Sequence, residues 1–179
     1  MEMTGLRCKY FTVLSEALRE TRAEFDGFLE SDVHVAPLNK ECLVRSSEWK
    51  DNPLEVRLAW KHVFDSSNSR QARHFGMAVF KHQTLIGLAF GRVSRGKKIV
   101  RVDMLERSFT YKPLKGIFTP WVIASAMNYA KRLGANSLKV TKPGNHVIHM
   151  LCSEEGGGVF READCNYSLP HIHFRIGEY

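Results

Sequence analysis

Three β-rich runs separated by very short turns lie near the middle of the chain, at residues 74–80, 84–93 and 98–109. The intervening turns are Lys81-His82-Gln83 and Ser94-Arg95-Gly96-Lys97. Turns this short join neighbouring antiparallel strands, because a parallel connection needs a crossover of about a dozen residues or more. The sequence therefore predicts a three-stranded antiparallel meander, around which the rest of the fold must be built.

A basic turn, a helix and a further strand follow the meander. Residues 111–116 form the turn, and apolar residues then recur at helical spacing along one face. Gly134 provides the stop signal of this helix, and Lys131 and Arg132 in its last turn suit the negative end of the helix dipole. Residues 137–141 are typical of a strand. A strand, a helix and a second strand in this order predict a parallel crossover.

The two ends of the chain supply the remaining elements. Residues 6–14 mix aromatic and β-branched side chains and predict a strand, and Ser15 is the expected N-cap of a helix after it. Pro37 and Asn39 predict a loop. The other expected elements are a helix that begins at Asn52 and Pro53, a shorter helix at 145–154, and strands at 159–165 and 171–176.

The expected element order is β-α-α-β-β-β-α-β-α-β-β. This order predicts an α/β (α+β) fold in which a mixed, mostly antiparallel sheet of six to seven strands is flanked by about four helices. A length of 179 residues without a linker favours a single domain over residues 1–179. No apolar run approaches the ~18 residues that span a membrane, and no signal peptide is visible, so we expect a cytoplasmic protein with no membrane partner.

The charge of the chain favours an anionic partner. Lys and Arg number 26 against 19 Asp and Glu, which gives a net charge of +7. This balance suits RNA, an acidic protein or a phosphorylated cofactor, although a solvated basic surface produces the same count. The four cysteines lie far apart and form no CxxC pair, which favours reduced thiols.

The element order and three short segments resemble the GCN5-related N-acetyltransferase (GNAT) superfamily. The segments are Lys-Pro-Leu-Lys-Gly-Ile at 112–117, Tyr-Ala-Lys-Arg-Leu-Gly at 129–134 and Ser-Leu-Lys-Val at 137–140. In that family the loop before the helix carries a Q/R-x-x-G-x-G/A signature that wraps the pyrophosphate of acetyl-CoA. Gly116 matches this signature, whereas Pro113 replaces its Gln or Arg and Phe118 replaces its last small residue.

The resemblance implies acetyl-CoA as co-substrate and assigns two groups of residues to it. Its phosphates would lie against Lys112, Lys115, Gly116, Ile117, Phe118 and Thr119. Its pantetheine arm and thioester carbonyl would meet the strand backbone at Met104, Leu105, Arg107 and Ser108. The free amides of a helix start beside lysine side chains suit such phosphates. The alternative is a basic surface loop before a helix that Thr119 caps and Pro120 begins.

The resemblance also implies a general acid on the last helix. The family motif there is N-x-x-A-x-x-L-Y, with the Asn on the CoA arm and the Tyr as acid. Counting from Asn145 puts Cys152 at the Tyr position. A thiol is acidic enough to protonate a departing thiolate. A free cysteine on a helix is also a common small apolar filler, so both interpretations of Cys152 stay open.

The resemblance also implies a general base near the end of the third meander strand, where Glu106 is the candidate and Asp103 the other carboxylate. A spacing of three puts these two side chains on opposite faces of a regular strand, so that only one faces the site unless a bulge intervenes. The alternative role for both carboxylates is pairing with Arg101 or Arg107 on a solvated face.

The resemblance implies an acetyl-CoA-dependent N-acetyltransferase, in which a primary amine attacks the thioester directly. One alternative is a catalytically inactive module of the same fold that binds nucleic acid or a partner protein. Another is an acyltransferase similar to the acyl-homoserine lactone synthases. The histidine pairs His146/His149 and His171/His173 lack a complete zinc-ligand spacing, so no metal is expected. The acceptor amine stays unspecified, and a homodimer is compatible with a sheet that has a free edge.

Overall fold

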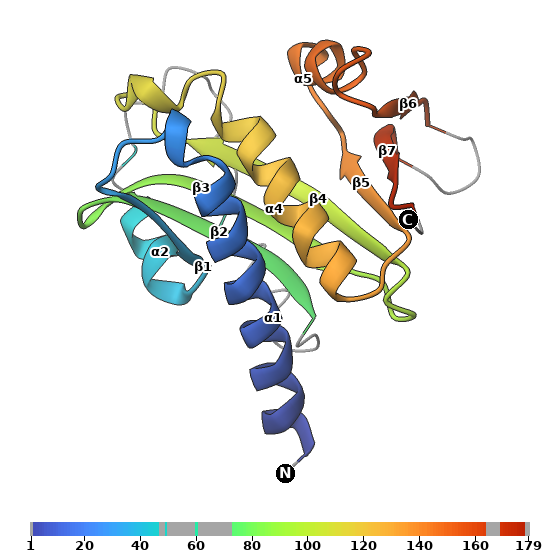
Figure 1. Ribbon diagram of the computed structural model, residues 1–179, viewed down its shortest axis with the longest axis horizontal. Helices are drawn as coiled ribbons and strands as arrows, with labels where there is room; N and C mark the ends of the chain where they lie inside the picture. The colour runs from blue at the N-terminus through green and yellow to red at the C-terminus, as the bar shows by residue number, and fades with distance from the viewer. Residues whose placement is uncertain (1, 47–48, 50–59, 61–72, 164–168, 178–179) are drawn as a thin grey trace.

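A computed structural model describes residues 2–46, 49, 60, 73–163 and 169–177. Its seven strands form one sheet in the order β1-β2-β3-β4-β5-β7-β6 (Figure 1). Every pair of neighbouring strands is antiparallel except β4 and β5, which are parallel. The elements are α1 (Glu2–Glu24), β1 (Val33–Pro37), α2 (Lys40–Ser46), β2 (His74–Lys81), β3 (Thr84–Val93), β4 (Ile99–Arg107), α4 (Phe118–Arg132), β5 (Ser137–Thr141), α5 (Asn145–Leu151), β6 (Val159–Arg161) and β7 (His171–Arg175), with short 3-10 turns at Asp26–Phe28 and Lys112–Leu114.

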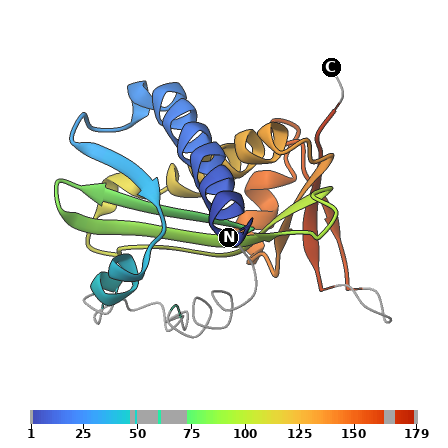
Figure 2. The ribbon, with the colours of Figure 1, turned by 90° about the horizontal axis from the view of Figure 1, so that it is seen from below.

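The two faces of the sheet are covered by different helices. Helices α1 and α4 lie side by side on one face, and α2 lies on the other (Figure 2). The larger core cluster joins α1, α4 and α5 to the sheet and includes Leu18, Trp121 and Val147. The smaller cluster lies on the α2 side and includes Leu38 and Phe90. We call these surfaces the α4 face and the α2 face of the sheet.

The N-terminal segment is a helix, so the strand predicted at 6–14 is wrong. Tyr10, Leu14, Ala17 and Leu18 are the buried residues of its central part, and this spacing follows a period near 3.6 rather than 2. Ser15 lies inside the helix, where its hydroxyl donates to the carbonyl of Phe11 at 2.8 Å, so it is no N-cap. The aromatic and β-branched residues of this segment mark one buried helical stripe.

The first strand of the sheet is β1, and it occupies part of the predicted loop at Pro37. Its position at the edge of the sheet accommodates a proline, because one side of an edge strand has no partner to bond. The first strand and the first helix therefore exchange places relative to the predicted order. The helix expected from Asn52 lies outside the described residues apart from Trp60, which is helical.

The middle and the C-terminal half match the predictions closely. The three meander strands, the helix that ends at Arg132 and the strand 137–141 are confirmed, as is the parallel crossover between β4 and β5. The last helix ends earlier than expected, at Leu151, and β6 is limited to three residues within the predicted run 159–165. The predicted mixed, mostly antiparallel sheet with flanking helices is thus confirmed.

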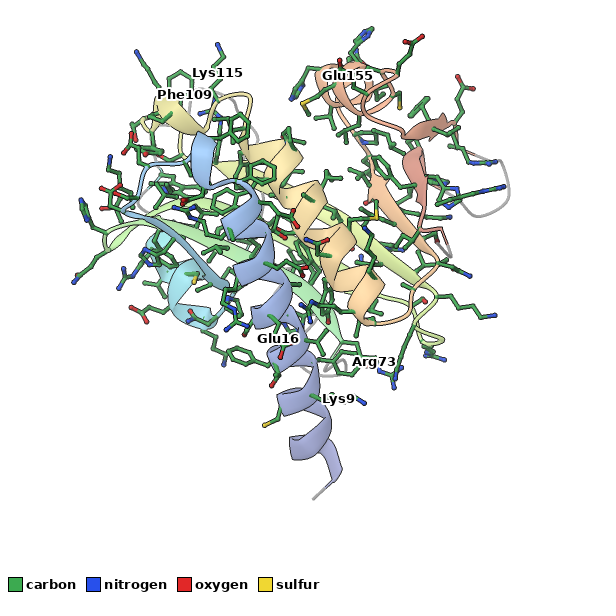
Figure 3. The ribbon with its side chains drawn as sticks, viewed as in Figure 1. Lys9, Glu16, Arg73, Phe109, Lys115 and Glu155 are labelled. Atoms are coloured by element: carbon green, nitrogen blue, oxygen red, sulfur yellow. The ribbon has the colours of Figure 1, made fainter. Side chains whose placement is uncertain are left out.

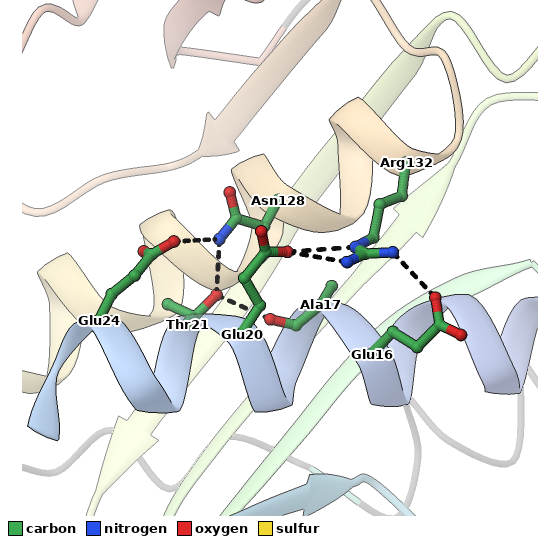
Figure 4. A network of polar contacts seen from close by, with 7 residues as sticks. All are labelled: Glu16, Ala17, Glu20, Thr21, Glu24, Asn128 and Arg132. Atoms are coloured by element: carbon green, nitrogen blue, oxygen red, sulfur yellow. Dashed lines mark hydrogen bonds and ion pairs between the residues drawn. The ribbon is translucent and has the colours of Figure 1, made fainter.

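A polar seam holds α1 against α4 (Figure 4). The guanidinium of Arg132 on α4 contacts Glu16 at 2.8 Å and Glu20 at 3.1 Å, both on α1. One turn further, the amide nitrogen of Asn128 donates to the hydroxyl of Thr21 at 3.0 Å and to Glu24 at 3.1 Å. The seam therefore fixes α4 against α1, the longest of the described helices. The N-terminus of α4 belongs to the candidate functional site.

No helix in the described part of the chain is both long and apolar enough to cross a lipid bilayer.

Candidate functional site

Strand β4 contains a bulge in the middle of the candidate site. Phe90 of β3 pairs with Met104, and the next residue, Gly91, pairs with Val102. Asp103 is therefore an extra residue in the strand, whose backbone has no pairing partner on β3. A Cβ atom on Gly91 would lie 1.7 Å from the carbonyl oxygen of Arg101, so the close approach of the two strands here requires glycine. The bulge that would bring both carboxylates to one face is therefore present.

The bulge turns the polar side chains of β4 toward the α2 face. Val102, before the bulge, belongs to the core under α4, whereas Met104, after it, packs against the smaller cluster. Glu106 accepts a hydrogen bond at 2.7 Å from the indole nitrogen of Trp60, a buried member of that same cluster. Leu105 packs into the core on the α4 face. Asp103 and Glu106 thus both leave the strand on the α2 side.

Asp103 is held by an ion-pair network, which is the alternative role that the sequence left open for both carboxylates. Its carboxylate contacts Arg92 at 2.8 Å and Arg101 at 3.0 Å, and its Oδ1 accepts a bond of 2.9 Å from the hydroxyl of Thr141 on β5. Burial raises the pKa of Asp103, but the hydrogen bond from Arg92 and the charges of Arg101 and Arg92 outweigh it and leave the pKa below its usual value. Asp103 therefore connects three neighbouring strands.

The parallel pairing of β4 with β5 ends beside Asp103. Residues Ile99–Val102 pair with Ser137–Val140, and no pairing to β5 continues along the rest of β4 in the described residues. The two strands diverge from this point (Figure 1). The amide of Ser108 donates to Ile86 of β3 at 2.8 Å, and the alternation of an antiparallel ladder then directs the amides of Leu105 and Arg107 away from β3, toward the diverging side.

The four backbone positions predicted for the pantetheine arm therefore differ in the direction of their amides. Leu105 and Arg107 present their amides to the gap between β4 and β5. The same alternation turns the amides of Met104 and Ser108 toward β3. The hydroxyl of Ser108 is also occupied, in a 2.8 Å hydrogen bond with Thr110.

The loop after β4 leads to a helix start that no side chain caps. The N-cap residue of α4 is Ile117, so Thr119 lies inside the helix and the predicted cap by Thr119 is wrong. Within the described part of the chain, the amides of Gly116, Phe118 and Thr119 have no hydrogen-bond acceptor, and Pro120 has no amide proton. In the described residues, two free donors of the first turn, at Phe118 and Thr119, thus point out of the positive end of a 15-residue helix, and the free amide of Gly116 precedes them in the loop.

Two exposed lysines lie in the loop just before this helix start, and the ring of its bulky residue is buried. Lys112 and Lys115 are exposed, and Gly116 has a positive φ of 85° that favours glycine. Phe118 is only 2% exposed, and a Cβ atom on Gly87 of β3 would lie 2.6 Å from its ring. The ring therefore packs on the sheet, so the large residue at the family's small position leaves the amides accessible.

The remaining predicted residues, Asn145 and Cys152, lie at the two ends of α5. This helix begins at the same end of the sheet as α4. Strands β4 and β5 run in parallel, so α4 and α5, which follow them, both begin at that end. Figure 3 shows Phe109 and Lys115 there, with Glu155 beyond α5. Asn145 is exposed at the first position of α5. Cys152 follows the last residue of α5 and is half-buried against the core of the α4 face.

Glu106 and Cys152 thus belong to opposite faces of the sheet. In the described residues, no group of three or more His, Cys, Asp or Glu side chains is placed to hold a metal ion. Trp60 is the partner that sequence reasoning missed, because no spacing connects it to a carboxylate 46 residues away.

Comparisons with solved structures identify the fold. An acetyltransferase from Streptococcus agalactiae shares 15% identity, covers 82% of this chain and 100% of its own, and has a TM-score of 0.57. The protein yncA from Salmonella typhimurium, solved with acetyl-CoA, shares 11% identity over 83% of this chain and 96% of its own, with a TM-score of 0.54. The ribosomal-protein-S18-alanine N-acetyltransferase from Escherichia coli shares 10% identity over 82% and 97%, with a TM-score of 0.60.

The chain therefore has the GNAT acetyltransferase fold. The sequence itself matches no family model and no curated protein. At these low identities the likeness establishes the fold alone.

Proposed function

We propose that the protein is an acetyl-CoA-dependent N-acetyltransferase that acts on a primary amine. One observation carries the proposal: the free amides at the start of α4 lie at the same end of the sheet as the outward amides of Leu105 and Arg107 on β4. The arrangement offers donors for phosphates and for a carbonyl oxygen along one path. The neighbour from Salmonella typhimurium, which was solved with acetyl-CoA, supports this choice of co-substrate.

Separate groups of residues would bind the phosphates and the thioester of acetyl-CoA. Lys112, Lys115 and the amides of residues 116, 118 and 119 would bind the phosphates, because a helix start and two ammonium groups attract anions. Acetyl-CoA, when bound, supplies a thioester whose carbonyl carbon the amine attacks. The amides of Leu105 and Arg107 would donate to the carbonyl oxygen and the pantetheine arm.

The proton transfers are assigned to the two predicted catalytic residues. The carboxylate of Glu106 would take the proton that the amine loses as the new C–N bond forms. The C–S bond breaks, and the departing sulfur takes a proton from the thiol of Cys152 or from water. The hydrogen bond from Trp60 holds one oxygen of Glu106, Oε2. The acceptor amine would approach from the α2 face, onto which Glu106 is directed.

Calorimetric titration with acetyl-CoA tests the proposal. Lys112→Ala combined with Lys115→Ala should weaken binding by about 1–3 kcal/mol, which corresponds to roughly 5–150-fold, if both side chains contact phosphates. Lys9→Ala combined with Lys131→Ala removes the same charge from exposed positions on α1 and α4 and should leave the affinity unchanged.

Equal effects of the two double variants would contradict the assignment of the phosphates to the loop. An absence of binding by the wild-type protein at high micromolar acetyl-CoA would contradict the proposed function itself. That result would favour the second candidate, an inactive module of the same fold, which is motivated by Pro113 at the Gln or Arg position and by Cys152 at the Tyr position.

A further inference from the structure

Five neighbouring strands each carry a basic or imidazole side chain at matching positions. His74 of β2 pairs with Arg92 of β3, and Arg92 pairs with Arg101 of β4. Arg101 pairs in turn with Lys139 of β5, and Lys139 pairs with His173 of β7. These five residues form a line that crosses the sheet perpendicular to the strands. We call this line the basic row.

The basic row lies on the α2 face. The ring of His74 stacks on Phe90, a member of the smaller core cluster, at a centroid distance of 5.9 Å. The other four side chains also point to the α2 face, because side chains alternate along a strand and the sequence neighbours of these residues point into the core on the α4 face. These core neighbours are Val93, Val100, Val102, Leu138, Val140, Ile172 and Phe174, and Phe75 next to His74 belongs to the same core.

Two further arginines extend the basic row at its β7 end. Arg175 lies two residues from His173 on the same strand face, and Arg161 of β6 pairs with His171. Both arginine side chains are exposed, and neither they nor Lys139 form an ion pair with an acidic side chain among the described residues. At the other end Asp103 offsets part of the charge of Arg92 and Arg101.

The electrostatic environment of His173 reflects this accumulation of positive charge. Its pKa is lowered, first by burial and then by the charges of Lys139, Arg161, His171 and Arg175. Every one of these charged neighbours is basic. A bound anion would therefore relieve repulsion among groups that the fold already holds close together.

We propose that the basic row, together with Arg161 and Arg175, binds the phosphodiester backbone of a single-stranded nucleic acid. Neighbouring strands lie about 4.8 Å apart, so the row presents its side chains over roughly 19 Å. Guanidinium groups match the geometry of phosphate oxygens. A chain of regularly repeated negative charges suits a row of arginine, lysine and imidazole side chains at regular strand spacing.

The surroundings of the basic row favour a nucleic acid over an acidic protein. Protein interfaces are organised around buried apolar and aromatic anchors. Near the row, the described residues expose two large apolar side chains, Val159 and Leu169, and no Phe, Tyr or Trp ring. Since the described residues near the row expose no Phe, Tyr or Trp ring on which bases could stack, we expect contacts to the backbone and binding that is independent of base sequence. This inference does not depend on acetyl transfer.

Fluorescence anisotropy with a labelled 20-nucleotide oligouridylate RNA, at several potassium chloride concentrations, tests the inference. The variant K139Q/R161Q/R175Q should bind roughly 10–100-fold more weakly at 0.1 M salt, and its slope of log K against log salt should be smaller by about 2, because single-stranded binding loses about 0.7 per phosphate contact. The control K9Q/R19Q/K131Q removes the same charge from α1 and α4 and should stay within about threefold of wild type.

Two further measurements complete the test. An oligothymidylate DNA of equal length distinguishes recognition of the shared backbone, where both probes bind alike, from recognition of RNA in particular. The NMR titration of His173 should shift to higher pH when the RNA is bound, since a nearby anion raises the pKa of an imidazole. Equal weakening by the two triple variants, a flat salt response, or equally tight binding of a polyglutamate of the same charge would each overturn the inference.

Discussion

Replacement of Asp103 by alanine should destabilise the protein far more than removal of an ordinary surface carboxylate. The side chain of Asp103 is 11% exposed, whereas those of its partners Arg92 and Arg101 are 52% and 37% exposed. A fully exposed pair contributes at most about 1 kcal/mol, and breaking a fully buried one costs about 3–5 kcal/mol. Since Asp103 lies between these limits and also loses its bond with Thr141, we expect a loss of about 2 kcal/mol at pH 7.

The pH dependence of this loss follows from the lowered pKa of Asp103. A carboxyl group whose pKa is lower in the folded state stabilises the fold fully above its unfolded pKa of about 3.9. That stabilisation disappears as the pH falls below this value and through the lower folded pKa. The difference in unfolding free energy between wild type and Asp103→Ala should therefore be constant between about pH 5 and 7 and should shrink below pH 4.

Urea denaturation followed by tryptophan fluorescence at pH 7, 4 and 2.5 measures both effects. Asp26→Ala is the matched control, because Asp26 forms a 2.8 Å ion pair with Arg22 while its side chain is 78% exposed. Asp103→Asn keeps an oxygen that accepts from Thr141 and should cost about half as much as alanine. The reasoning is refuted if Asp103→Ala costs no more than Asp26→Ala at pH 7, or if its cost is the same at pH 2.5.

Other positions give equally direct tests. Gly91→Ala should cost more than about 3 kcal/mol in thermal melting, because a Cβ atom there meets the backbone of Arg101, whereas Gly27→Ala, with open space around it, should cost little. Glu106→Gln should lower kcat by about 10²–10⁴-fold with acetyl-CoA affinity intact, and an unchanged kcat would remove Glu106 as the base. If Cys152 is the acid, Cys152→Ala and Cys152→Ser should both lower kcat by ~10–100-fold, whereas a filler would leave turnover near wild type and cost only about 1 kcal/mol of stability.

The C-terminal half of the fold could be predicted because its local signals agree with one another. Short turns, the stop at Gly134 and the parallel crossover all follow from neighbouring residues, and the strands and α4 are found where they were expected. The N-terminal helix could not be predicted in this way. Tyr10, Phe11 and Val13 raise the β-propensity of the segment, whereas its burial is decided by packing against α4. The same helix continues to Glu16 and Thr21, which hydrogen-bond to Arg132 and Asn128 of α4.

The loop of the candidate site was predictable from local residues, whereas the directions of the β4 amides and the partners of its carboxylates were not. Gly116 and the lysines mark the loop in the sequence, but only the structure shows that Thr119 leaves the helix start uncapped. Glu106 accepts a hydrogen bond from Trp60, a residue that only the fold, and no sequence motif, brings close to β4. The assignment of the ion pairs to Asp103 also needed the register of β3 against β4.

The bulge at Asp103 explains why one strand can serve both faces of the sheet. In a regular strand, Val102, Met104 and Glu106 would share a face, and Glu106 would point into the apolar core beneath α4, where an unpaired carboxylate is very costly. The single extra residue reverses the alternation, so Leu105 fills the core while Glu106 reaches Trp60 on the α2 face. The same residue, Asp103, then bonds to Thr141 at the point where β4 and β5 diverge. One inserted position therefore places the proposed base, Glu106, on the same face of the sheet as the basic row.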